Sequence, residues 1–168
     1  VVCFAGSLAV PYELLYRFME LHPQVQLKID EYPDEYPIHE IFQDEADVGI
    51  VLGHEGIAHC NYETLAQGKT VLVAKKGHPL TVKEEISVQD LQNISLILKA
   101  TEPGRDNPLL EYCHKQGITP KTLYTSGNLI AARRSCKQGL ALMESVDIIE
   151  KAYLDDELTV LPLKEKIN

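Results

Sequence analysis

Apolar and polar positions at the start of the chain form a strand pattern followed by a helix pattern. Residues 2–5 are an apolar run long enough for a buried strand, after which Gly6 and Ser7 turn the chain. Residues 11–21 carry apolar side chains at helical spacing, and Pro11 suits the first turn of a helix because its missing N–H is not needed there. The chain therefore leaves a strand and enters a helix through a glycine turn.

The pattern continues to about residue 70. Residues 25–31 alternate apolar and polar side chains, which is typical of a half-buried strand. Residues 38–42 predict a short helix, and residues 47–52, DVGIVL, predict a buried strand that ends at Gly53. The first seventy residues therefore have the order β-α-β-α-β, a half-unit of a mostly parallel sheet.

The second half repeats this alternation of strands and helices. Asn107 is suited to an N-cap, and Gly117 and Gly139 follow two predicted helices, as glycine commonly does. The predicted strands cover residues 62–65, 69–75, 94–98, 122–125, 140–143 and 159–163, and the predicted helical segments cover residues 88–91, 108–116, 129–138 and 146–153. We expect two α/β lobes: lobe I at residues 1–73, lobe II at residues 74–164, and a return toward lobe I at residues 165–168.

Glycine and hydroxyl residues occupy several loops that follow predicted strands. In α/β sheets, ligands bind outside the carboxyl ends of the strands, where helix N-termini offer unpaired N–H groups. We therefore expect these loops to line a cleft between the lobes. They contain Gly6-Ser7, Leu52-Gly53, residues 101–105 with Thr101 and Arg105, and Thr125-Ser126.

The charge of the chain argues against direct binding to nucleic acid. The formal net charge is −9, whereas a duplex-binding surface needs clustered Lys and Arg to neutralise phosphates. The nearest basic cluster consists of Arg133, Arg134 and Lys137 on one predicted helix.

Other kinds of chemistry lack their sequence signatures. Cys3, Cys60, Cys113 and Cys136 form no CxxC pair, so neither a zinc site nor a redox dithiol is indicated. We expect reduced thiols, no metal, no cofactor and, without a nucleophile–base pair, no enzyme activity. No apolar run reaches the ~18 residues that span a bilayer. Because the chain starts at Val1 inside a predicted strand, without an initiator Met, we expect an excised domain.

Six stretches of the sequence are informative in their order and spacing: RFMELHPQVQLKI (17–29), EADVGIVL (45–52), ETLAQGKTVLVAKKGHPL (63–80), SVQDLQNISLI (87–97), GRDNPLLEYCHKQGITP (104–120) and CKQGLALM (136–143). HPL after a strand and QGLALM after a helix are the most characteristic. Together they cover most of the chain, and the set resembles the effector-binding domain of LysR-type transcriptional regulators.

The resemblance implies an α/β fold of two Rossmann-like lobes, similar to type-2 periplasmic-binding proteins. It implies a cytoplasmic, ligand-sensing domain of a bacterial transcription factor, which binds a small anionic effector between its lobes and forms a dimer without membrane contact. In the family, DNA contacts come from a helix-turn-helix domain that precedes this one. The implied effector contacts are Gly6, Ser7, Leu8, Leu52, Gly53, Thr101, Arg105, Thr125 and Ser126, although Leu52 stands where some relatives carry a hydroxyl.

Two features depart from the family pattern. AGSLA at residues 5–9 looks like the opening loop of molybdate- or tungstate-type solute-binding proteins, where a serine and helix amides hold an oxyanion. It favours an anionic ligand, and it makes a solute-binding protein of a transport system, for an oxyanion or small carboxylate, the alternative function. The family domain also runs further, so lobe I is expected to be incomplete at its C-terminal part.

The candidate contacts also have structural alternatives. Ser7, Thr125 and Ser126 can each cap a helix instead of contacting a ligand. Arg105 suits bidentate pairing with a ligand carboxylate, or a surface pair with a neighbouring acidic residue. The sequence leaves both alternatives open.

Overall fold

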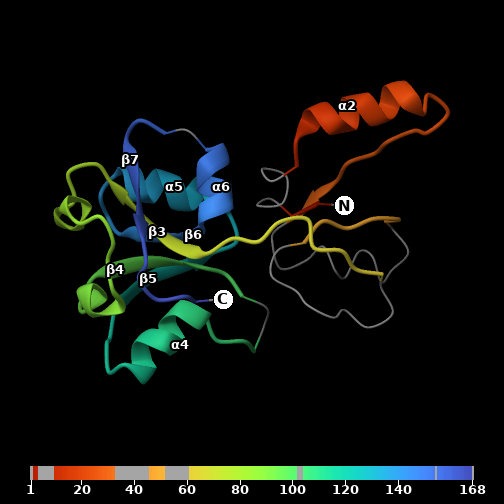
Figure 1. Ribbon diagram of the computed structural model, residues 1–168. Helices are drawn as coiled ribbons and strands as arrows, with labels where there is room; N and C mark the ends of the chain where they lie inside the picture. The colour runs from red at the N-terminus through yellow and green to blue at the C-terminus, as the bar shows by residue number, and fades with distance from the viewer. Residues whose placement is uncertain are drawn as a thin grey trace. The chain divides into compact units, whose positions relative to one another are not determined.

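The computed structural model describes residues 2–3, 10–32, 46–51, 61–101, 104–153 and 155–167. The chain divides into two compact units, Val1–Glu63 and Thr64–Asn168 (Figure 1). Strand β3 (Thr70–Lys75) belongs to the second unit, because it is hydrogen-bonded on both sides to strands of that unit. The lobe boundary after residue 73 stays a prediction.

The first unit contains one described helix and one described pair of strands. Helix α2 (Tyr12–Leu21) follows the predicted range, and Pro11 occupies its N-cap. Strands β1 (Val2–Cys3) and β2 (Glu31–Tyr32) pair in parallel. No residue of α2 is buried, and most of its apolar side chains are exposed, whereas Leu15 is half-buried.

Several strand predictions fail in the first unit and the segment after it. The sequence predicted strands for residues 25–31, 47–52 and 62–65. Of their described residues, only Glu31 lies in a strand and only Ile50 forms a single bridge. Val25, Val48 and Leu65 are 42%, 69% and 71% exposed. A segment of alternating apolar and polar residues forms a strand only where a neighbouring strand supplies hydrogen bonds and other residues bury its apolar face. The predicted helix at residues 38–42 lies outside the described residues.

The second unit contains one mixed sheet in the order β5-β4-β6-β3-β7. Its other strands are β4 (Ser95–Lys99), β5 (Lys121–Ser126), β6 (Leu142–Val146) and β7 (Leu158–Pro162). Strand β4 is parallel to β5 and β6, whereas β3 is antiparallel to β6 and β7. The carboxyl ends of β4, β5 and β6 therefore lie at the same end of the sheet.

The helices of the second unit confirm the predicted order. They are α4 (Pro108–Lys115), α5 (Leu129–Lys137) and α6 (Asp147–Ala152), with short 3₁₀ helices at Pro79–Val82 and Val88–Leu91. The Asn107 side chain caps α4 by accepting a hydrogen bond from the Leu110 N–H at 3.0 Å, as predicted. No helix among the described residues is long and apolar enough to cross a membrane.

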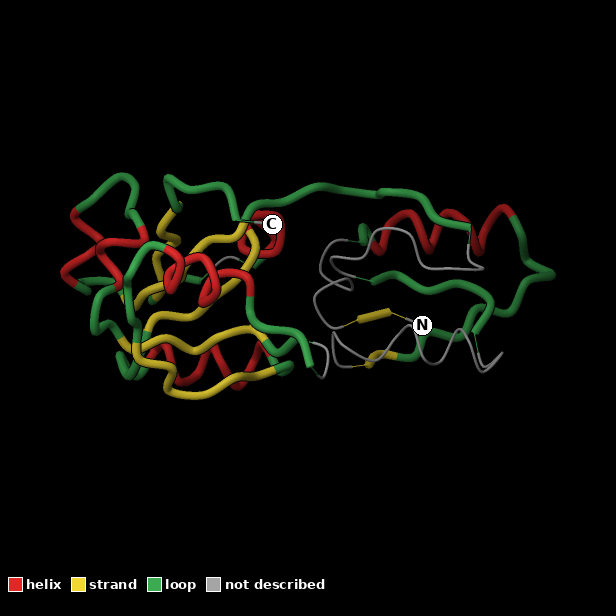
Figure 2. Tube along the Cα trace, turned by 90° about the horizontal axis from the view of Figure 1, so that it is seen from below, coloured by secondary structure: helices red, strands yellow, loops and turns green. Residues whose placement is uncertain are grey.

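Helices cover both faces of this sheet (Figures 1 and 2). On one face, Leu109 and Cys113 of α4 belong to a buried cluster with strand residues such as Leu72. On the other face, Ala132 and Cys136 of α5 join a second buried cluster. The sheet is therefore packed between helices on both faces. Residues 104–106 and Thr125, near the carboxyl ends of β4 and β5, are exposed.

Candidate functional site

The structure describes four of the predicted contact residues. Thr101 and Arg105 lie in the loop between β4 and α4, and Thr125 and Ser126 end strand β5. The other predicted contacts, Gly6, Ser7, Leu8, Leu52 and Gly53, lie outside the described residues.

Parallel pairing brings the ends of β4 and β5 together. Leu98 pairs with Thr125 and Lys99 with Ser126. The Ala100 N–H extends the ladder by donating to the Ser126 carbonyl oxygen at 3.1 Å. The two loops that the sequence singled out in this unit therefore start side by side, at the end of the sheet where α/β proteins place their ligands.

Ser126 makes its hydrogen bonds within the β5–α5 turn. Its Oγ accepts a hydrogen bond from the Asn128 N–H at 3.0 Å and lies 3.2 Å from the Asn128 carbonyl oxygen, to which it donates. Asn128 in turn caps α5 by accepting from the Ala131 N–H. Asn128, and not Ser126, therefore caps α5. Ser126 stabilises the turn that precedes the helix, and Thr125 is exposed.

The β4–α4 loop is closed by one of its own side chains. The Thr101 Oγ1 donates to the Arg105 carbonyl oxygen at 2.7 Å. The Arg105 residue is exposed. The hydrogen bond ties the two ends of the loop to each other and holds Arg105 close to the strand end.

Sequence reasoning missed Glu144, an acidic residue of β6 that is hydrogen-bonded to both ends of this loop. Its Oε2 accepts hydrogen bonds from the Lys99 N–H at 2.8 Å and from the Asn107 side-chain amide at 2.7 Å. The only signal in the sequence was an acidic residue inside the apolar run of β6. Burial raises the pKa of Glu144, and the two hydrogen bonds oppose that rise. Because the folded state holds the proton more tightly, this group lowers the free energy of unfolding as pH rises through its raised pKa.

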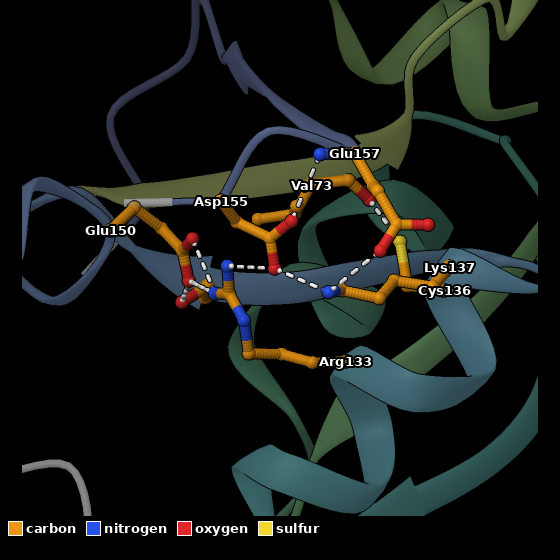
Figure 3. A network of polar contacts seen from close by, with 8 residues as sticks. Val73, Arg133, Cys136, Lys137, Glu150, Asp155 and Glu157 are labelled. Atoms are coloured by element: carbon orange, nitrogen blue, oxygen red, sulfur yellow. Dashed lines mark hydrogen bonds and ion pairs between the residues drawn. The ribbon is translucent and has the colours of Figure 1, made fainter. Parts of the chain in front are cut away.

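The basic cluster noted in the sequence lies in a different environment (Figure 3). Arg133 is buried, and its Nη1 donates to both carboxylate oxygens of Glu150 at 2.9 and 2.7 Å. Asp155 lies 3.4 Å from the Arg133 Nη2 and 3.0 Å from the Lys137 Nζ. Burial raises the pKa of Asp155, but hydrogen bonds from the Glu157 N–H and Lys137 outweigh it and lower the pKa. These two cations are therefore matched by carboxylates and are not presented to a phosphate backbone.

Cys113 and Cys136 are buried and unsuited to thiol chemistry. Cys113 and Cys136 are free thiols, and the Cys136 Sγ lies 3.2 Å from the Val73 carbonyl oxygen (Figure 3). Burial raises the pKa of Cys136 to about 11, and reactive cysteines have lowered values. Within the described part of the chain, no cluster of three or more His, Cys, Asp or Glu could hold a metal ion.

A hollow of about 390 Å³ lies along α4. It is lined by Asp106, Leu110, Glu111, His114 and Lys115. Acidic and basic side chains both line it, so the hollow does not select an anion.

Comparison with known sequences identifies one family. A family model described as "LysR substrate binding domain" matches residues 3–167. The HTH-type transcriptional regulator CysL of Bacillus subtilis (strain 168) is 24% identical over 149 residues, which are 88% of this chain and 50% of CysL. The HTH-type transcriptional regulator AlsR of the same strain is 27% identical over 126 residues, 71% of this chain and 41% of AlsR. The chain thus spans about half the length of these relatives or less.

Comparison with solved structures confirms the fold. The regulatory domain of Synechocystis PCC6803 CcmR, in complex with 2-PG, matches with a TM-score of 0.81 at 20% identity, over 99% of this chain and 80% of that one. The QuiR effector binding domain, in complex with shikimate, matches with a TM-score of 0.81 at 17% identity and the same coverage. The BenM effector binding domain with benzoate gives a TM-score of 0.75 at 13% identity, over 98% and 76%. The chain therefore has the α/β, type-2 periplasmic-binding-protein-like fold of these domains.

Proposed function

This chain belongs to the LysR substrate binding domain family, and we propose that it is the part of a bacterial transcription regulator that binds a small anionic effector. The curated relatives are named as transcriptional regulators, which favours this role over a transport solute-binding protein and over an enzyme. In this proposal the regulator acts in the cytoplasm, and a helix-turn-helix region of a longer protein contacts DNA.

The meeting of two loops at the carboxyl ends of β4 and β5 carries the proposal. The exposed Thr125 and Arg105 lie on these loops, which begin next to each other. A hydroxyl and a guanidinium can both donate to a carboxylate or an inorganic oxyanion, and the guanidinium can do so with two N–H groups. Similar domains bind 2-PG, shikimate and benzoate, which supports a small molecule as ligand. All nine predicted contacts stay predictions: Gly6, Ser7, Leu8, Leu52, Gly53, Thr101, Arg105, Thr125 and Ser126.

A thermal-shift screen tests whether the ligand is an anion. The compounds are sulfate, phosphate, benzoate and shikimate, with a neutral amide and an alkylammonium salt for comparison. An anion at 100 times its dissociation constant should stabilise the fold by about 2.7 kcal/mol. Arg105→Gln should weaken that anion about tenfold or more, because a hydrogen bond to a charged group contributes about 1.5–3 kcal/mol.

Arg134→Gln is the matched control, since Arg134 is also exposed but lies on α5. It should leave the affinity of the anion within about twofold, a difference of less than 0.5 kcal/mol by the relation between affinity and free energy. Stabilisation by the neutral or cationic compounds alone would reject an anionic effector, and equal losses in the two variants would remove Arg105 from the site.

We also propose that the chain self-associates through α2. Leu14 and Leu21 of this helix are 59% and 66% exposed, and a cluster of exposed apolar side chains marks an interaction surface. Sedimentation velocity at micromolar concentration should show a dimer that Leu14→Glu with Leu21→Glu converts to monomer. Glu20→Gln, an exposed change on the same helix, should leave the dimer intact. A wild-type protein that sediments only as monomer would contradict the proposal.

A further inference from the structure

Glu144 occupies an unusual place for an acidic residue. It lies on β6, two positions after Leu142, and alternate residues of a strand share a face. Leu142 belongs to the buried cluster that includes Leu109 of α4, so Glu144 faces the side of the sheet that α4 covers. An ionised carboxylate there loses hydration that its hydrogen bonds only partly replace. Core packing therefore does not account for an acidic residue at this position.

The contacts of Glu144 reach both ends of the β4–α4 loop. One oxygen, Oε2, accepts from the Lys99 N–H at the end of β4 and from the Asn107 amide at the start of α4. Asn107 is buried, lies 3.3 Å from the Lys99 carbonyl oxygen through its Nδ2, and caps α4 with its Oδ1. A single carboxylate oxygen on β6 is therefore hydrogen-bonded to the end of β4 and to the residue that caps α4. These two residues, Lys99 and Asn107, flank the β4–α4 loop.

We infer that Glu144 is a positioning residue, which holds the β4–α4 loop in the shape that places Thr101 and Arg105 for the effector. This inference rests on the proposed function for the ligand, but the fixing of the loop is a property of the chain alone. The hydrogen-bonding oxygen does the positioning. The negative charge is not needed for it, because an amide oxygen accepts the same two hydrogen bonds.

Two substitutions distinguish the effect of the hydrogen-bond acceptor of Glu144 from the effect of its negative charge. Glu144→Gln keeps an acceptor of the same size and removes the charge, and Glu144→Leu removes both. Glu165→Leu is the matched control, because Glu165 is a half-buried carboxylate that accepts a backbone N–H, from Val88 at 3.3 Å, in a different segment. Amide hydrogen exchange of the ligand-free protein measures how well the amides of the loop are protected. Calorimetry measures the dissociation constant of the anion that binds most tightly in the screen.

In Glu144→Leu, amides of residues 99–110 should exchange about tenfold faster, the change expected for an opening free energy lower by 1.4 kcal/mol. The amides of β3 should keep their protection, and the anion should bind about tenfold more weakly. Glu144→Gln should restore both wild-type protection and affinity, a rescue that general destabilisation would not give.

The inference is overturned if amides of residues 99–110 exchange no faster in Glu144→Leu than in Glu165→Leu. It is also overturned if Glu144→Leu speeds exchange in β3 as much as in the loop. It is also overturned if Glu144→Gln behaves like Glu144→Leu. If the loop responds as expected while none of the anions binds the wild type, the fixing of the loop stands and the proposed anionic effector is rejected.

Discussion

Replacing Arg133 with methionine should lower the free energy of unfolding by about 3–5 kcal/mol, because removing one partner of a buried ion pair leaves an uncompensated charge. The side chains of Arg133 and Glu150 are only 5% and 3% exposed. Among the described residues, the Glu150 carboxylate would keep only the hydrogen bond from the Ser145 Oγ, at 2.6 Å. Arg133 also stacks on the Tyr153 ring, 4.2 Å from its centroid, and that contact would be lost as well. Urea denaturation measures the difference.

Two further variants test the cause. Arg134→Met changes the neighbouring but exposed arginine and should shift the free energy of unfolding by less than about 0.5 kcal/mol. Arg133→Met combined with Glu150→Leu should recover much of the loss, because two apolar side chains of similar size can replace a buried ion pair. The Arg133 Nε, buried without a hydrogen-bond partner among the described residues, adds to that recovery. A double variant less stable than Arg133→Met alone would contradict this account.

Truncating Leu72 to alanine should lower the free energy of unfolding by about 2–5 kcal/mol, the range for large-to-small changes in cores. Leu72 is fully buried on β3, where it pairs with Glu144 of β6 on one side and Leu161 of β7 on the other. A cavity there would loosen the contact between the sheet and α4. Urea denaturation with an unchanged m-value measures the loss.

Leu140→Ala is the matched control for this core position, because Leu140 is 59% exposed. It should change the free energy of unfolding by less than about 0.5 kcal/mol. Similar effects of the two changes would show that the sheet of the second unit does not form the core described.

Local sequence signals predicted the second unit well. Asn107 and Gly117 mark the ends of α4, and Gly117 takes a φ of +73°, which glycine adopts without strain. These signals act within a few residues, so they can be recognised without knowledge of the fold. The alternation at residues 25–31 was an equally clear local signal, yet the described strand there is only Glu31–Tyr32. Pairing with a neighbouring strand decides that outcome, and pairing is not local.

The missed residues share a dependence on distant partners. The sequence showed Arg133 only as part of a basic cluster on one predicted helix, whereas its carboxylate partner Glu150 follows 17 positions later on another helix. Glu144 contacts the Lys99 N–H, which is 45 positions earlier. Neither pair lies within one helix or one strand, so local sequence signals do not reveal these contacts.

The most direct test of the central claim is to map where an anion binds. ¹⁵N-labelled protein is titrated with the anion that stabilises it most, and amide shifts are followed. The account predicts saturable shifts that are largest at residues 99–107 and 125–128, and that weaken in Arg105→Gln. Shifts confined to the hollow along α4 at Leu110, Glu111, His114 and Lys115, or no saturation with any anion, would contradict it.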